Sequence, residues 1–130
     1  MQICKLNPWT YPEGMDQGVM ISDFNRLVFV SGQCAVGADG SSLHPGDMAG
    51  QVQAALNNVE TVLAEAGLSL TNIVRMNTYV TDMKAFLEHA AEPMSERLAK
   101  HDVSPPGVLA GIMELGRKDL LVEIEVFAAA

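Results

Sequence analysis

The feature that most constrains the fold is an apolar stripe of helical period between Met48 and Ala66. Its members are Met48, Val52, Ala55, Leu56, Val59, Val62, Leu63 and Ala66, separated by steps of one, three or four residues. Such steps place side chains on one face of an α-helix. Asp47 stands where an N-cap residue belongs, and Gly67 stands where a left-handed residue ends many helices. The sequence therefore predicts a long amphipathic helix, which needs a partner surface to cover.

Segments on both sides of this helix have the pattern of β-strands. Two short runs, 19–22 and 27–31, are separated by four turn-forming residues and predict a hairpin after an irregular N-terminal lead-in. Three further strands are predicted at Ile73–Val80, Val108–Met113 and Leu120–Ala128. In the last of these, Val122, Ile124 and Val126 alternate with polar residues, which indicates one buried face.

A second helix is predicted from Asp82, its N-cap, to about His101, with a kink or a break at Pro93. The expected order is β-β-α-β-α-β-β, with two helices on one mixed sheet, which is an α+β fold. The other face of the sheet would carry apolar side chains such as Tyr79, Leu121 and Phe127. A monomer would expose that face, so we expect the chain to form a symmetric oligomer.

Length and charge limit the classes of partner. A chain of 130 residues suits one domain, 1–130. Sixteen acidic against eight basic residues give a formal net charge of −8, which disfavours nucleic acid and anionic membrane surfaces as partners. No apolar run reaches the ~20 residues of a membrane span, and no signal peptide is recognisable. We therefore expect a cytoplasmic protein that binds a small molecule or other protein chains.

Cysteine, histidine and arginine give weaker signals. His44, His89 and His101 lack metal-ligand spacing, and the usual nucleotide-binding motifs are absent, so neither a metal nor another cofactor is predicted. Cys34 lies in an apolar stretch and is expected to be a buried, inert thiol. Arg117 and Lys118 are expected to lie in a solvated loop between strands.

Four segments together resemble the RidA (YjgF-type) family. They are VFVSGQ (28–33), QVQAALNNVETVLAEAGLSL (51–70), IVRMNTYVTDMKAF (73–86) and LLVEIEVFA (120–128), and they span nearly the whole chain. The resemblance implies a chorismate-mutase-like fold and a homotrimer with clefts between adjacent subunits. It also implies hydrolysis of reactive enamines or imines to a carbonyl compound and ammonia, without a cofactor.

The same resemblance assigns site residues position by position. Glu123, the first glutamate of VEIE, matches the catalytic residue that positions water. The expected substrate-binding positions are Ser31, Gly32, Gly107, Val108, Leu109 and Met15. Gly107 stands where the family has its carboxylate-binding arginine, so the chain resembles a divergent member. Leu109, Met15 and Ala90 replace a cysteine, a tyrosine and an asparagine of the family, which makes the expected cleft more apolar.

Several alternatives remain open at this stage. Glu123 is either a water-positioning base or a solvated strand residue, and Ser31-Gly32 either binds ligand or only allows a tight strand exit. Gly107 either makes room for a bulkier substrate or marks a decayed site, while Arg75 either replaces the missing cation or forms a surface ion pair. The sequence favours an imine or enamine deaminase acting on a substrate other than small 2-imino acids. The alternative is a non-catalytic trimer that binds a metabolite or a protein; a nuclease is disfavoured by the negative charge.

Overall fold

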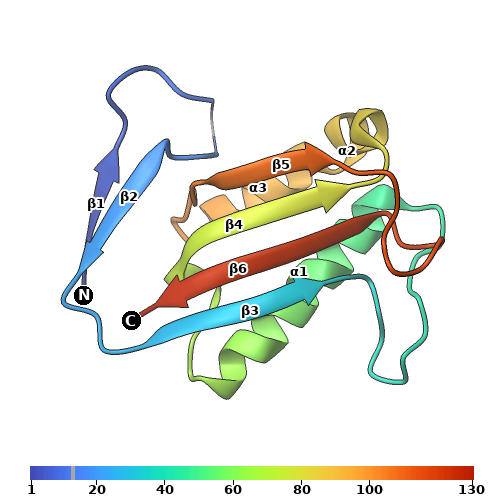
Figure 1. The fold of residues 1–130 in the computed structure, drawn as a ribbon, viewed down its shortest axis with the longest axis horizontal. Helices are drawn as coiled ribbons and strands as arrows, with labels where there is room; N and C mark the ends of the chain where they lie inside the picture. The colour runs from blue at the N-terminus through green and yellow to red at the C-terminus, as the bar shows by residue number, and fades with distance from the viewer. Residues whose placement is uncertain (13) are drawn as a thin grey trace.

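The computed structural model describes residues 1–12 and 14–130. Its main sheet has four strands in the order β3-β6-β4-β5, with bounds Leu27–Gln33, Val122–Ala129, Ile73–Val80 and Gly107–Gly111. Strand β6 is antiparallel to both of its neighbours, whereas β4 and β5 are parallel (Figure 1). The predicted mixed sheet is confirmed.

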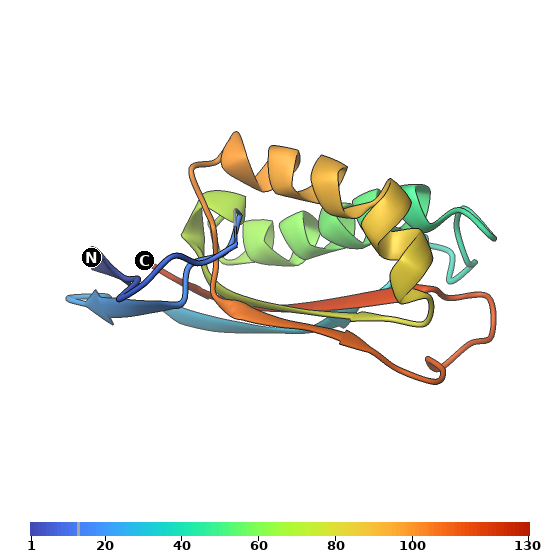
Figure 2. The ribbon, with the colours of Figure 1, turned by 90° about the horizontal axis from the view of Figure 1, so that it is seen from above.

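All α-helices cover the same face of this sheet. They are α1 (Met48–Glu65), α2 (Met83–His89) and α3 (Ala91–Ala99), and a 3-10 turn, η1 (Leu70–Asn72), leads into β4. Figure 2 shows the helices as one layer above the strands, and none of the helices in the described part of the chain lies on the other side. The expected α+β class is confirmed.

The local signals at the ends of α1 act as predicted. The Asp47 carboxylate accepts a hydrogen bond from the backbone N–H of Gly50 at 2.9 Å, and Gly67 has a φ of +67°. One member of the stripe was assigned wrongly: Val62 is 38% exposed, and it faces a surface hollow. Gln51, which the stripe did not include, is fully buried and makes polar contacts in the interior.

Strand β6 forms the centre of the core. Val122, Ile124 and Val126 are fully buried beneath α1, and the residues between them point to the opposite face. The predicted alternation is therefore confirmed. This alternation places Glu123 and Glu125 on the face that bears no helix.

The N-terminal prediction was wrong in two respects. Residues 2–6 form a strand, β1 (Gln2–Leu6), and β2 (Gly18–Ser22) pairs with β1 in a separate two-stranded sheet instead of with β3 (Figure 1). The turn at 23–26 connects the two sheets. It is held by the N–H groups of Asn25 and Arg26, which both donate to the carbonyl of Ala130. These bonds align β3 with β6 and prevent a hairpin.

The predicted second helix is divided into α2 and α3. The division falls at Ala90, three residues before Pro93, and Pro93 lies in the first turn of α3, where a missing N–H costs nothing. The last two strands also shift: β5 starts at Gly107 and ends at Gly111, and β6 starts two residues later than predicted. Met113, which the sequence placed in β5, is 98% exposed.

Asp16 joins the N-terminal sheet to the segment before β5. Its carboxylate accepts a hydrogen bond from the Ser104 hydroxyl at 2.7 Å and pairs with Lys5 at 3.3 Å. Burial alone would raise the pKa of Asp16, but the hydrogen bonds from Ser104, Asn7 and Lys5 outweigh it and lower that pKa. This cluster fixes the neighbouring residue, Met15, beside the start of β5.

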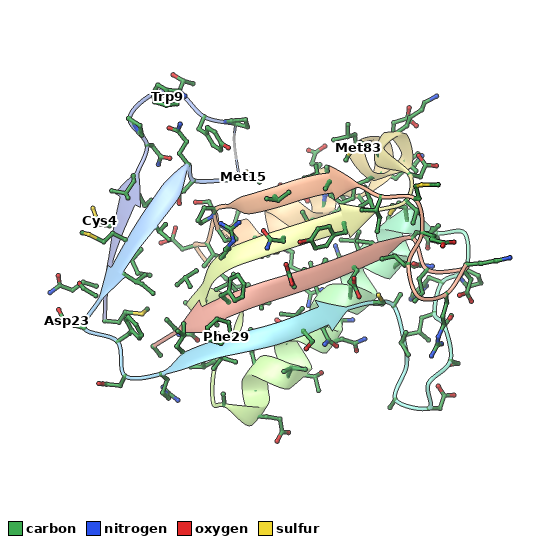
Figure 3. The ribbon with its side chains drawn as sticks, in the orientation of Figure 1. Cys4, Trp9, Met15, Asp23, Phe29 and Met83 are labelled. Carbon is green, nitrogen blue, oxygen red and sulfur yellow. The ribbon has the colours of Figure 1, made fainter. Side chains whose placement is uncertain are left out.

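The face of the sheet without helices is partly apolar, as expected. Phe29 is 69% exposed there and makes an edge-to-face contact with Phe127 at a centroid distance of 5.3 Å. Figure 3 shows the Phe29 side chain on this face. Leu121 lies just before β6 and not within it.

In the described part of the chain, none of the helices combines the length and the apolar character of a membrane span.

Candidate functional site

Glu123 lies against a bulge in β3 that contains Ser31 and Gly32. The register of the β3–β6 pair slips between Val30 and Gln33, so one extra residue is accommodated there. A Cβ atom at position 32 would lie 2.5 Å from Cδ of Glu123. Gly32 therefore leaves the space that the carboxylate of Glu123 occupies. This role differs from both roles considered for Ser31-Gly32 from the sequence, which were ligand binding and a tight strand exit.

Cys34 contacts the same carboxylate. Its Sγ donates to Oε1 of Glu123 at 3.7 Å, which is the only side-chain hydrogen bond to Glu123 within residues 1–12 and 14–130. Burial, together with the charge and the hydrogen bond of Glu123, raises the pKa of Cys34 to about 11. The thiol is half-buried rather than buried, but the expectation that it is inert agrees with this raised pKa.

We expect Cys34 to resist alkylation at pH 8. With a pKa of about 11, only about one thiol in a thousand is ionised there, and the thiolate is the reactive form. The experiment is a time course of iodoacetamide labelling, followed by mass spectrometry, in a Cys4→Ser background that removes the exposed thiol. Labelling should rise with pH up to about 11.

The matched variant is Glu123→Gln in the same background. Removing the carboxylate's charge should lower the pKa of Cys34 and speed labelling about three- to tenfold. Equal rates with and without Glu123 would contradict the contact between the two side chains.

Glu123 and Cys34 line an open hollow of about 670 Å³ at the end of β3. Gly32 and Val62 also line it, and so does Arg117, from the segment between β5 and β6. Arg117 and Lys118 are exposed in the loop between these strands, as expected, and Arg117 in addition borders this end of the sheet. Its guanidinium donates to the carbonyl of Gly40 at 2.7 Å.

Two amide side chains of α1 hold the walls of this hollow. Asn58 donates to the carbonyls of Cys34 and Val36 at 2.8 and 2.9 Å. Gln51 donates to the carbonyl of Asp119 at 2.8 Å and accepts from the N–H of Leu121 at 2.8 Å. Neither residue was among the predicted site residues; the signal in the sequence was a polar side chain inside or beside the apolar stripe of α1.

Three of the other predicted binding residues lie in a second hollow, at the β5 edge, which Gly107 does not line. Met15, Val108 and Leu109 line it together with Met76 and Met94, and its volume is about 260 Å³. The lining is mostly apolar, and Figure 3 places Met15 beside the start of β5. Ser31, in contrast, is exposed on β3 and lines neither hollow. Within one copy of the chain, the predicted site is thus divided between two places.

Gly107 has a role in the backbone of the sheet. It pairs with Met76 at the start of β5, and any Cβ atom at position 107 would overlap the carbonyl oxygen of Met76. The close approach of two backbones is a common reason for glycine in a strand. Neither earlier reading of Gly107, room for a substrate or decay of a site, included this constraint.

Glu125, two residues from Glu123, is engaged in the sheet. Its Oε1 accepts hydrogen bonds from Asn77 at 2.8 Å and from Tyr79 at 2.9 Å, and the bond from Tyr79 raises the pKa of that phenol. Asn77 in turn accepts from the N–H of Val108 at 3.0 Å. This network joins β6, β4 and β5, whereas the Glu123 carboxylate faces a hollow.

The chain matches a known protein family over most of its length. The profile of the family described as Endoribonuclease L-PSP, which is the YjgF/RidA family, matches residues 16–130. The chain belongs to this family. The match begins at Asp16 and covers both hollows except for the segment that precedes Asp16.

Relatives within the YjgF/RidA family cover most of the chain. A RutC family protein of Aquifex aeolicus is 35% identical over 106 residues, which is 82% of each chain. TdcF of Escherichia coli, which its name describes as a candidate reactive intermediate deaminase, is 31% identical over 114 residues, covering 86% of this chain and 83% of TdcF.

Solved structures of the YjgF/RidA family have the same fold. The Rid family protein YyfB of Yersinia pestis superimposes with a TM-score of 0.78 over the full length of both chains, at 26% identity. The structure of Escherichia coli TdcF with bound serine gives a TM-score of 0.72 at 27% identity, covering 97% of this chain and 94% of TdcF.

In this YjgF/RidA family member, no three His, Cys, Asp or Glu side chains among the described residues gather closely enough to hold a metal ion. The chemistry available in the hollow is that of one carboxylate, one half-buried thiol and one guanidinium. A carboxylate can accept a proton from water, and a guanidinium can pair with an anion.

Proposed function

We propose that the chain hydrolyses a reactive imine or enamine to a carbonyl compound and ammonia, on a substrate other than the small 2-imino acids. The observation that carries this proposal is the position of Glu123. Its carboxylate is seated against Gly32 beside an open hollow, while the neighbouring Glu125 is bound into the sheet. The name of the related TdcF, which describes a deaminase, supports the same reaction class.

In this proposal, Glu123 accepts a proton from a water molecule as the water oxygen bonds to the imine carbon. The carbon–nitrogen double bond becomes a single bond, and the tetrahedral adduct carries a hydroxyl and an amino group. Glu123 returns its proton to the nitrogen to complete that amino group; the hydroxyl proton then moves to the same nitrogen as the carbon–nitrogen bond breaks, ammonia leaves and the carbon–oxygen double bond forms. Water and imine are the only reactants, so no oxidant or cofactor is required.

The apolar hollow at the β5 edge supports a substrate with a sizeable apolar group. Its volume is about 260 Å³, and a cavity of ~150 Å³ lined by apolar side chains is enough to bind benzene. Met15, Met94 and Leu109 would contact such a group. Methionine suits this role because its flexible thioether adapts to different shapes.

The separation of the two hollows supports a cleft shared between copies of the chain. If the β5 edge of one copy meets the β3 end of the next, two different surfaces are in contact, and such heterologous contacts form a ring when the rotation between copies closes. A homotrimer, as the resemblance implies, is the ring we propose. The exposed Phe29 and the half-buried Phe127 would then be covered, and sedimentation of a lone protomer in dilute buffer would contradict this assembly.

A second candidate function is a cytoplasmic, non-catalytic trimer that binds a small metabolite. The observation that favours it is Gly107, which leaves the β5 edge without the cation expected there. Ribonuclease activity, the description attached to the family profile, is disfavoured by the net charge of −8, because phosphate backbones are bound by clustered lysine and arginine.

The test uses imines generated in situ by an amino-acid oxidase and trapped with semicarbazide. We expect the protein to lower semicarbazone formation from the imines of phenylalanine and leucine more than from that of alanine, because of the apolar hollow. Heat-denatured protein is the control. Unchanged trapping across a broad panel of amino acids would refute the deaminase and favour the binding protein.

A further inference from the structure

Arg117 lies where a cation would serve the proposed reaction. It lines the same hollow as Glu123 and Cys34, and its positive charge acts on the Cys34 thiol, which itself contacts Glu123 at 3.7 Å. One carboxylate and one guanidinium therefore border a single open space of about 670 Å³.

The guanidinium of Arg117 is held in place by a loop. Its Nη1 donates to the carbonyl of Gly40 at 2.7 Å and to the hydroxyl of Ser42 at 3.3 Å. No acidic side chain of the described residues lies within ion-pair distance of Arg117. Nη2 and Nε make no hydrogen bond within the same part of the chain, and this edge of a guanidinium can bind a carboxylate through two parallel hydrogen bonds.

The other arginines of the described chain are placed elsewhere. Arg97 pairs with Glu60 at 2.8 Å, and Arg26 donates to the carbonyl of Ala66 at 2.9 Å. Arg75, which the sequence analysis considered as a substitute cation, lies in a groove between the two sheets with Phe127 and lines neither hollow. Among the described residues, Arg117 is thus the arginine that lines the same hollow as Glu123.

We propose that Arg117 pairs with an anionic group of the substrate, in the role that position 107 cannot fill. This inference rests on the proposed function and narrows it to imines that carry a carboxylate as well as an apolar group. The carboxylate would lie against Nη2 and Nε of Arg117, and the imine carbon would face Glu123. The cation that the family has at position 107 is then supplied from position 117 instead, and the absence of an arginine at Gly107 does not mean that the ligand is uncharged.

The test compares two imines that share an apolar group and differ in the carboxylate. One is the imine of phenylalanine, made by an amino-acid oxidase, and the other is the imine of phenethylamine, made by an amine oxidase. Arg117→Gln should lower kcat/KM for the first about 10- to 100-fold and leave the second within about twofold. Arg117→Lys should give an intermediate loss, because it keeps the charge but not the planar fork.

Lys118→Gln is the matched control. It removes the same charge from the adjacent exposed residue, which lines neither hollow, and should not affect either imine. If Arg117 only anchors the loop at Gly40 and Ser42, Arg117→Gln will affect both imines equally. That result, or no effect on either, would overturn the proposal.

Direct binding separates this inference from the proposed function. Calorimetric titration with phenylpyruvate, the carbonyl product, should show binding that weakens about 10- to 100-fold in Arg117→Gln. If neither imine is hydrolysed but this binding depends on Arg117, the deaminase is refuted and the anion site is supported. If phenylpyruvate binds equally to both proteins, or to neither, the anion site is refuted whatever the activity.

Discussion

Glu123→Gln should lower imine hydrolysis by about 10²- to 10⁴-fold, because the amide cannot accept the proton of the attacking water. The substitution keeps the shape of the side chain, so the space above Gly32 remains filled. Affinity for phenylpyruvate should change much less than turnover. The measurement is kcat/KM in the semicarbazide competition assay, together with calorimetric titration of the same preparation.

Glu125→Gln is the matched control for this prediction. Oε1 of Glu125 accepts hydrogen bonds from Asn77 and Tyr79, so this substitution should lower the melting temperature while most of the turnover is kept. Glu123→Gln should have the opposite profile, because the contact from Cys34 is its sole side-chain hydrogen bond to the described residues. If Glu123→Gln retains full turnover, Glu123 is not the base, and the non-catalytic binder becomes the better account.

Short sequence patterns were sufficient to predict α1, β4 and the buried face of β6. The stripe from Met48, the cap at Asp47 and the glycine at 67 predicted α1, and the alternation in 122–126 predicted the buried face of β6. Strand β4 has the predicted bounds, Ile73–Val80. In each case, the pattern that identifies the element lies within its own short segment, although β4 and β6 are stabilised by pairing with each other and with β5 and β3.

Pairings between distant segments could not be predicted in this way. Strand β2 has the pattern of a hairpin partner for β3, but its partner is β1, and the turn at 23–26 is held by the carbonyl of Ala130 at the other end of the chain. The sequence predicted the helix break at Pro93, because proline is the local signal for a kink or a break, but the break lies at Ala90. Proline in a first helical turn is tolerated, so it did not mark the break.

The same distinction applies to the site. The resemblance identified Gly32 and Glu123 as separate site residues, and the structure places them in contact. It could not reveal Arg117, because the residue reaches the hollow through a loop bonded to Gly40. Gln51 and Asn58 were missed for a related reason: a polar residue on a helix does not indicate which distant backbone it holds.

Gly107→Ala should destabilise the protein by about 3 kcal/mol or more, even though it adds one methyl group at the edge of a sheet. Any Cβ atom at this position overlaps the carbonyl oxygen of Met76, which belongs to the backbone of β4 and cannot move aside as a side chain would. The start of β5 must shift away from β4. Thermal unfolding should show a decrease in melting temperature of roughly 10 °C.

Gly111→Ala, at the other end of β5, is the matched control. A Cβ atom there would meet only Cε of Met83, at 3.9 Å, so little change in melting temperature is expected. Gly107→Arg should be as unstable as Gly107→Ala and should not gain activity on the imine of alanine, because the backbone clash precedes any contact of the guanidinium. If Gly107→Ala and Gly111→Ala were equally stable, Gly107 would not be required by the backbone. A cation could then be restored at the β5 edge, and the position would again be open to a role in the choice of substrate.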